Sequence, residues 1–274
     1  MLTYVSDGIK RNFFGVLVFM SFLLHSQSGA IALESSFTVE SIKPYFHGYT
    51  ASMVVLDLKS GTVFKYNPQI CDQRLSPCST FKIFNSLAGL ERGVVADENQ
   101  YFKWDGTINS RSECNRDQTL QTAVSNSVVW CFQQVAAGVG EEPMKAFLKA
   151  EHYGNQDISG GITKFWLGNS LKISANEQVE FLKDLVTDKL SFSKRSMAIV
   201  RGLIRLESTD HGVLYGKTGS DMVNGKTTLG WFVGYVVHPD QIYVFAANTQ
   251  AEDKATGLRT KEIVRQILID KKLL

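Results

Sequence analysis

The chain has 274 residues, of which 44% are hydrophobic and 20% are charged, and its net charge at pH 7 is +2. This composition is typical of a globular protein that is long enough to bury a large core in one or two lobes. The sequence contains no basic run and no interleaving of aromatic and basic residues, so we expect neither nucleic acid nor an anionic membrane surface as a partner.

The N-terminal residues follow the order of a secretory signal peptide. Two basic residues precede an apolar run from Phe13 to Leu24, and small residues follow it. An apolar run of about 12 residues is too short to span a bilayer. We therefore expect residues 1–30 to be a signal peptide, cleaved after Ala30 or Ala32, and the protein to be periplasmic or secreted without stable membrane association.

An exported protein can keep disulfides, and four cysteines are present: Cys71, Cys78, Cys114 and Cys131. Cys71 and Cys78 flank a turn, and their spacing permits a bridge without requiring one. Cys131 lies in an apolar stretch and is expected to be free. No Cys/His cluster has the spacing of a zinc site, so we predict no metal.

Predicted strands lie at both ends of the chain and predicted helices lie between them. A hairpin is predicted from Met53–Leu56 and Val63–Tyr66 around a Ser-Gly turn. Helical periodicity follows at 79–92, 121–136, 142–151, 176–189 and 194–206. After Gly212, strands are predicted at Val213–Thr218, Thr228–Val237 and Gln241–Asn248, and an amphipathic helix at about Leu258 to Leu273.

This order predicts an α+β fold. We expect one antiparallel β-sheet flanked by helices, built from about 31–78 and 207–274, with an inserted, mostly helical lobe at about 79–206. A small-molecule site is expected in the cleft between the two parts.

Ser79 and Lys82, in Ser76-Pro77-Cys78-Ser79-Thr80-Phe81-Lys82, are the first candidate catalytic pair. The apolar pattern after Ser79 predicts a buried helix that Ser79 opens, with Lys82 one turn further on and within reach of its hydroxyl. A helix start offers free N–H groups and a dipole that favour developing negative charge. A serine needs such an adjacent base to act as a nucleophile.

The same spacing occurs again at Ser191-Phe192-Ser193-Lys194. This copy lies among polar residues and is expected to be a solvated helix start. Ser-x-x-Lys alone is therefore a weak signal, and an N-capped core helix is the simpler explanation of the first copy as well.

Three further stretches carry polar groups that such a serine would need. They are Ser125-Asn126-Ser127-Val128-Val129, Tyr153-Gly154-Asn155 followed by Trp166, and Lys217-Thr218-Gly219 followed by Ser220. Each has a simpler explanation when taken alone: helix capping, a turn, and an edge strand that ends in a solvated lysine. Gly219 would let another backbone approach closely.

Taken together and in this order, the motifs resemble those of the class D serine β-lactamases in the penicillin-recognising family. Related enzymes carry Ser-x-x-Lys, Ser-Asp-Asn and Lys-Thr-Gly. Apolar Val129 stands here where the second motif has Asn, which is the class D form. The resemblance runs from the first hairpin to the C-terminal helix and implies the same fold and a β-lactam substrate.

The resemblance also implies roles for individual residues. Ser79 would attack the β-lactam carbonyl, Ser127 would pass a proton to the departing nitrogen, and the backbone N–H groups of Ser79 and Ser220 would hold the oxyanion. Substrate-binding residues would be Lys217, Thr218, Gly219 and Arg259. No separate cofactor is implied, but Lys82 would add CO₂ and serve as a carbamate base, with Val129 as an apolar wall and the Trp166 indole as a donor.

Two rival functions remain. A β-lactam sensor or transpeptidase domain would be acylated at the same serine and deacylate slowly, although such proteins carry a membrane-spanning portion or further domains that we do not expect here. A non-catalytic binding module would have lost Ser79, Lys82 or Lys217, and all three are present. The sequence leaves open both the range of β-lactams and whether the protein is a monomer or a dimer.

Overall fold

The computed structural model describes residues 1–3 and 36–274. Apart from its first three residues, the predicted signal peptide lies outside the described residues. The centre of the fold is a six-stranded antiparallel sheet with the strand order β2-β1-β8-β7-β6-β5. The strands are β1 (Thr50–Asp57), β2 (Val63–Tyr66), β5 (Arg205–Ser208), β6 (Val213–Val223), β7 (Lys226–His238) and β8 (Gln241–Gln250). The predicted sheet, formed from both ends of the chain, is confirmed.

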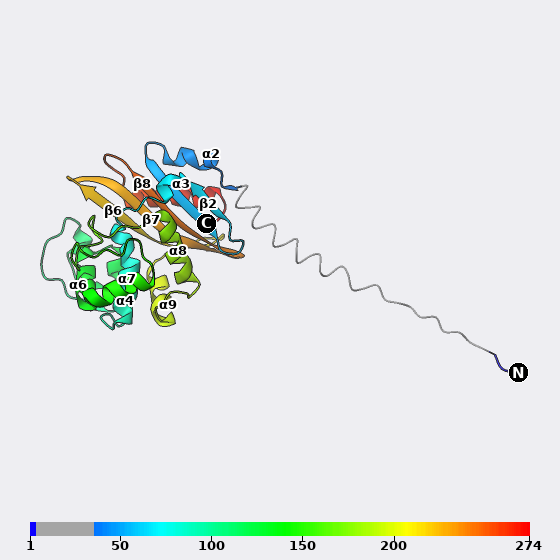
Figure 1. The fold of residues 1–274 in the computed structure, drawn as a ribbon, viewed down its shortest axis with the longest axis horizontal. Coiled ribbons are helices and arrows are strands. Elements are labelled where there is room, and N and C mark those ends of the chain that lie inside the picture. The colour runs from blue at the N-terminus through cyan, green and yellow to red at the C-terminus, as the bar shows by residue number, and fades with distance from the viewer. Residues whose placement is uncertain (4–35) are drawn as a thin grey trace.

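Most of the helices lie in the middle part of the chain. The α-helices are α2 (Val39–Ile42), α3 (Pro68–Cys71), α4 (Lys82–Glu91), α5 (Leu120–Ser125), α6 (Val129–Val139), α7 (Glu141–Ala150), α8 (Ala175–Val186), α9 (Lys194–Leu203) and α10 (Gly257–Asp270). Short 3₁₀ turns are η1 (Lys43–Phe46), η2 (Cys78–Phe81) and η3 (Ser112–Cys114), and β3 (Tyr101–Phe102) pairs with β4 (Gln118–Thr119). Helices α4, α6, α7 and α9 gather beside one side of the sheet (Figure 1).

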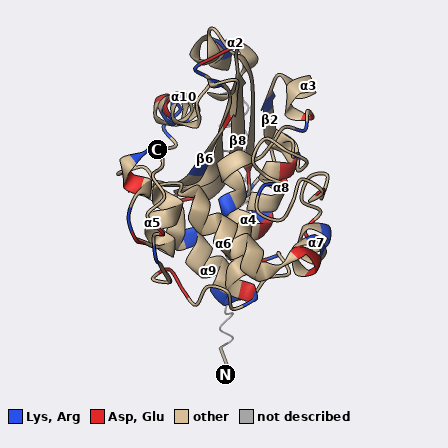
Figure 2. Cartoon of the chain, turned by 90° about the vertical axis from the view of Figure 1, so that its left-hand side faces the viewer, with Lys and Arg blue, Asp and Glu red and all other residues tan. Residues whose placement is uncertain are grey.

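Both faces of the sheet are buried. On β8, Val244 and Ala246 belong to the core shared with the helical part, whereas Phe245 and Ala247 face the core under α10. Successive side chains of a strand point to opposite faces, so a strand covered on both sides is apolar throughout. Figure 2 shows the molecule turned by 90°, with α10 beside the strands of the sheet and with both basic and acidic residues on the outer helix α7.

Helix α4 is buried on all sides rather than along one face. Its residues from Lys82 to Leu90 are buried, and it contacts α6 and α9. Arg92 caps its C-terminus, and Gly93 follows with φ of 69°. The predicted end of this helix is therefore confirmed. The apolar residues after Ser79 recur at spacings that mark only one buried face, and this part of the prediction is wrong, because α4 packs against α6 and α9 in the middle of the helical part.

Two predicted helices have different bounds. The segment 121–136 forms two helices, α5 and α6, separated at Ser127, whose φ of 54° cannot continue a helix. Helix α9 ends at Leu203, and Arg205–Ser208 pairs with β6 instead. In both places the spacing of the apolar residues matches a helix, but contacts with other segments of the folded chain set the backbone conformation: Ser127 with Lys217, and Arg205–Ser208 with β6.

Replacing Gly234 with alanine is expected to destabilise the protein by about 1–3 kcal/mol, the usual cost of overpacking. Gly234 on β7 pairs with Gly216 on β6, and a Cβ there would lie 2.0 Å from the carbonyl oxygen of Tyr215. Urea unfolding measures the change. Gly202→Ala is the matched control, because it adds a Cβ to exposed α9 with nothing within 4 Å. Equal midpoints for the two variants would contradict this packing.

Candidate active site

Ser79 lies in the sharp turn that leads into α4. Cys78 before it has φ of 50°, and η2 then joins α4 directly. Lys82 Nζ donates a hydrogen bond to Ser79 Oγ at 2.9 Å. Ser79 therefore lies in a 3₁₀ turn rather than in the first turn of an α-helix. In 3₁₀ geometry residues three apart eclipse one another, which aligns the hydroxyl with the amine.

The Lys82 amine is held in an apolar enclosure. The residue is 1% exposed, and its Nζ lies 5.3 Å from the centroid of the Phe132 ring. Burial, and after it the cation of Arg111, lower the pKa of the Lys82 amine from 10.5 to about 7. A substantial fraction of the molecules therefore carries a neutral amine at neutral pH, and a neutral amine can accept the Ser79 proton.

Ser127 reaches the same site from the connection between α5 and α6. Lys217 Nζ on β6 donates to Ser127 Oγ at 3.0 Å and to the carbonyl oxygen of Thr218 at 3.1 Å. Burial, and the neighbouring cations Lys82, Arg111 and Lys261, hold the pKa of Lys217 well below its usual range. The structure thus joins the two predicted motifs by a direct hydrogen bond.

The middle of β6 packs against the serine turn. A Cβ on Gly219 would lie 2.9 Å from the carbonyl oxygen of Pro77 and 3.3 Å from the backbone nitrogen of Ser79. On the other side of the strand, Ser220 Oγ accepts a hydrogen bond from the N–H of Gly257 at 2.8 Å. Ser79, Gly219 and Ser220 are therefore neighbours, and only glycine fits between β6 and the serine turn.

Trp166 is fully buried beside the same turn. Its ring stacks on Phe81, the residue before Lys82, with 5.4 Å between centroids. Its indole Nε1 has no hydrogen-bond partner among the described residues. A buried donor without a partner costs free energy, so this atom marks a place where an acceptor is expected.

Ser76 connects these parts, although the sequence indicated only a turn there. Its Oγ donates to the carbonyl oxygen of Trp166 at 3.0 Å and accepts from the N–H of Gly168 at 2.9 Å. Its own carbonyl oxygen accepts from Trp231 Nε1 at 2.9 Å. Ser76 therefore ties the serine turn to the Trp166 loop and to β7.

Arg111 is a second residue that the sequence did not single out. Its guanidinium Nη2 donates to the carbonyl oxygen of Ser127 at 3.1 Å. A basic residue on a polar loop carries no motif, so only its contact in the folded chain identifies it.

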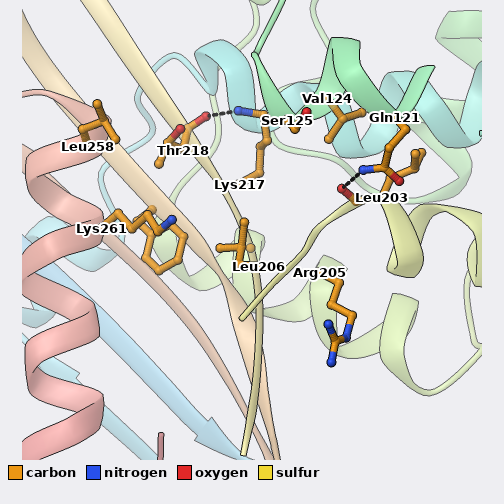
Figure 3. Close-up of a pocket in the computed structure, with 12 residues that line it drawn as sticks. Gln121, Val124, Ser125, Leu203, Arg205, Leu206, Lys217, Thr218, Leu258 and Lys261 are labelled. Carbon is orange, nitrogen blue, oxygen red and sulfur yellow. Dashed lines mark hydrogen bonds between the residues drawn. The ribbon is translucent and has the colours of Figure 1, made fainter. Parts of the chain in front are cut away.

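A pocket of about 140 Å³ begins at Thr218 and extends towards α10 (Figure 3). It is lined by Lys217, Thr218, Leu258 and Lys261, among others, and none of its twelve lining residues is acidic. Ser79 is not among the lining residues, and the pocket adjoins the catalytic motifs only through Lys217 and Thr218. A pocket lined by basic and no acidic side chains suits an anionic group.

Two predicted site residues have other surroundings. The side chain of Arg259 is 52% exposed, its Nη1 lies 3.2 Å from Glu262 on α10, and Arg259 does not line the pocket. Val129 is half-buried at the start of α6. The roles of both residues stay predictions.

Tyr153-Gly154-Asn155 shapes the loop that carries Trp166. A Cβ on Gly154, whose φ is 56°, would lie 2.1 Å from the carbonyl oxygen of Lys172. The Asn155 side chain accepts from the N–H of Lys172 at 2.9 Å and donates to the carbonyl oxygen of Ser170, also at 2.9 Å. This motif therefore forms a turn.

The structure also describes the second Ser-x-x-Lys and the paired cysteine candidates Cys71 and Cys78. The second Ser-x-x-Lys is a helix start, with Ser193 as the N-cap of α9 and Lys194 exposed, as predicted. Cys71 and Cys78 are both free and buried, so they form no bridge. Within residues 1–3 and 36–274, no helix is long and apolar enough to cross a membrane.

Comparison with known proteins finds relatives over most of the chain. The family profile described as penicillin binding protein transpeptidase domain matches residues 43–269. The chain is 38% identical over 247 residues to the probable β-lactamase YbxI of Bacillus subtilis, covering 90% of each protein. The solved class D β-lactamase BAT-2 is 37% identical, with a TM-score of 0.82, over 87% of this chain and 99% of that one.

A relative of another kind also matches. The regulatory protein BlaR1 of Bacillus licheniformis is 37% identical over 235 residues, which are 85% of this chain and 39% of BlaR1.

We expect Lys82→Met to stabilise the protein by on the order of 3 kcal/mol near pH 7 in CO₂-free buffer. Between pH 7 and 10.5 the unfolded chain binds one more proton at Lys82 than the folded protein, so wild-type stability rises with pH across this interval. The advantage of the variant should therefore shrink as the pH approaches 10.5.

Urea unfolding at several pH values measures this difference. Lys145→Met is the matched control, because it removes an exposed lysine from α7 whose surface pair with Glu142 contributes little. A Lys82→Met variant that is less stable than wild type at pH 7, or whose advantage does not depend on pH, would contradict the neutral buried amine.

Proposed function

The chain belongs to the class D family of serine β-lactamases, and from this we infer that it hydrolyses the amide bond of β-lactam antibiotics through a serine acyl-enzyme. The observation that carries this inference is the hydrogen bond from the Lys82 amine to Ser79 Oγ at 2.9 Å, made inside an apolar enclosure. A hydroxyl with a neutral buried amine beside it has its base in place.

In the acylation step, Ser79 Oγ attacks the lactam carbonyl carbon and forms the ester bond. Its proton passes to the base at Lys82. The carbon–nitrogen bond then breaks, and the nitrogen takes a proton from Ser127 Oγ, which Lys217 orients at 3.0 Å. Ser127 regains a proton from the base at Lys82, so that the proton taken from Ser79 ends on the leaving nitrogen. The backbone N–H groups of Ser79 and Ser220 stabilise the oxyanion, and each such donor typically contributes about 3 kcal/mol.

The substrate carboxylate would be held in the middle of β6, where Lys217 and Thr218 line the pocket. A bound carboxylate would favour the charged form of the Lys217 amine, because an opposite charge nearby stabilises it, and Thr218 would offer a hydroxyl. Gly219 keeps the strand close to Ser79, so that the two oxyanion donors lie on one side of the substrate. Arg259 can join them if its guanidinium leaves Glu262, and an exposed ion pair of this kind costs about 1 kcal/mol or less to break.

The residues around Lys82 fit a carboxylated lysine. The amine is neutral in part at pH 7, as reaction with CO₂ requires, and the buried Trp166 Nε1 needs an acceptor. When carboxylated, Lys82 would offer an anionic oxygen as general base both to Ser79 and to the water that releases the acyl group. Val129 would contribute to the apolar wall. We expect CO₂ to be the only addition and no metal to take part.

A β-lactam sensor is the alternative, and the similarity to BlaR1 is the observation that favours it. A sensor would share the acylation step and differ in releasing the acyl group slowly. Export by a signal peptide, to a periplasm or the medium, is part of the enzyme proposal, with β-lactams as the small-molecule substrates.

The first test is hydrolysis of a chromogenic cephalosporin by the mature protein, with and without added bicarbonate. Turnover should rise with bicarbonate, because CO₂ regenerates the base. Ser79→Ala should show no adduct in the intact mass, and Lys82→Ala should lose at least about 100-fold in turnover, the usual contribution of a general base.

The matched control is Ser191→Ala with Lys194→Ala, which removes the serine and the lysine of the second Ser-x-x-Lys and should hydrolyse at the wild-type rate. An adduct that forms once and persists at saturating bicarbonate would establish the sensor instead. Turnover that is unaffected by verified removal of CO₂ would refute the carboxylated lysine and leave the hydrolase.

A further inference from the structure

Arg111 is a cation at the active site that the steps above do not use. It lies just before η3 on the loop that leads to α5, and its side chain is 47% exposed. Its Nη1 lies 3.4 Å from Glu113 at the surface, whereas its Nη2 points inward. Arg111 therefore links the solvent-facing loop to the residues around Ser79.

On its inner side, the Arg111 guanidinium contacts Ser127 and Cys114. Nη2 donates to the carbonyl oxygen of Ser127 at 3.1 Å and lies 3.2 Å from the sulfur of Cys114. Ser127 has a φ of 54°, which a residue with a side chain adopts only when surrounding contacts hold it there. The hydrogen bond from Arg111 is one of these contacts, and it fixes the peptide that presents Ser127 Oγ to Lys217.

The charges around Lys82 give Arg111 a second effect. The titratable and charged groups that surround the amine are Cys78 of η2, Arg111, Cys114 of η3, Cys131 of α6 and Lys217 of β6. Burial raises the pKa of the Cys78 and Cys131 thiols, so these two carry no charge near pH 7. Arg111 is thus the permanent cation of this set, because a guanidinium does not lose its proton.

We propose that Arg111 is a positioning residue that favours carboxylation of Lys82 and holds Ser127 in its left-handed conformation. This inference rests on the carboxylated lysine of the proposed function. In the reaction, the lone pair of the neutral Lys82 amine forms a bond to the carbon of CO₂, and one proton leaves the nitrogen for solvent. A nearby cation favours the neutral amine over the ammonium ion, and it also favours the anionic product. Both effects of the Arg111 charge therefore favour carboxylation of Lys82.

The test is a titration of the purified protein with ¹³C-labelled bicarbonate at fixed pH, in which ¹³C NMR measures the fraction of Lys82 that is carboxylated. Arg111→Met should raise the bicarbonate concentration at half-saturation by about three- to tenfold, as expected for a partly solvated charge at short range. Arg111→Lys keeps the charge and should stay within about twofold of wild type.

The control is Arg116→Met, which removes the same charge from the same loop at an exposed position that has no hydrogen bond to Ser127. It should titrate like wild type. Added salt should reduce the difference in the half-saturating bicarbonate concentration between wild type and Arg111→Met, because ions in the solvent can screen the half-exposed Arg111. A merely structural role of Arg111 would not produce this salt dependence.

Arg111→Met and Arg111→Lys should both slow acylation under saturating CO₂ in single-turnover experiments, because neither keeps the guanidinium contact to the Ser127 carbonyl. Identical bicarbonate curves for wild type and Arg111→Met, in a variant with wild-type unfolding, would overturn the electrostatic role. Wild-type acylation by both variants would overturn the positioning role. A wild-type protein with no carbamate signal would refute the carboxylated lysine itself, whereas an absence of any β-lactam turnover would refute the enzyme.

Discussion

The burial of the Lys82 amine is the constraint on which the site depends. An ammonium ion without water is costly, so the folded protein holds this amine neutral at a pH where a solvated lysine is charged. The enclosure is built by aromatic rings, with Phe132 over the amine and Phe81 stacked on Trp166. Burial of the Lys82 amine lowers the stability of the folded protein and places a base next to Ser79. Such a loss of stability in favour of activity is common at active sites.

The sheet brings the second half of the site to this amine. The middle of strand β6 lies against the serine turn, and Gly219 and Gly257 are the residues that permit the close approach on its two sides. Lys217, on the same strand, then reaches across to Ser127 from the helical part. Residues more than 130 positions apart thus form one site, since β6 lies between α10 and η2.

Both β-lactamases and the regulatory protein BlaR1 are relatives of this chain. Under the proposed mechanism, acylation needs the serine, a base, the oxyanion donors and the proton carried by Ser127. Release of the acyl group would also need a base that acts again on water, and we propose that a carboxylated Lys82 supplies it. Trp166 Nε1, which has no partner among the described residues, would donate a hydrogen bond to it. A hydrolase and a sensor that share this site would then differ in the release step.

Periodicity and motifs were enough to predict the fold class and the polar groups of the site. Strand periodicity at both ends predicted the sheet, and the ordered motifs identified Ser79, Lys82, Ser127 and Lys217, because local spacing fixes which side chains can meet within one turn. The folded chain was needed to find the break at Ser127, the β5 strand, the free state of Cys71 and Cys78, and the contacts of Ser76 and Arg111. These depend on contacts between distant segments, on burial and on charge, and none of them leaves a periodic or motif signal in the chain.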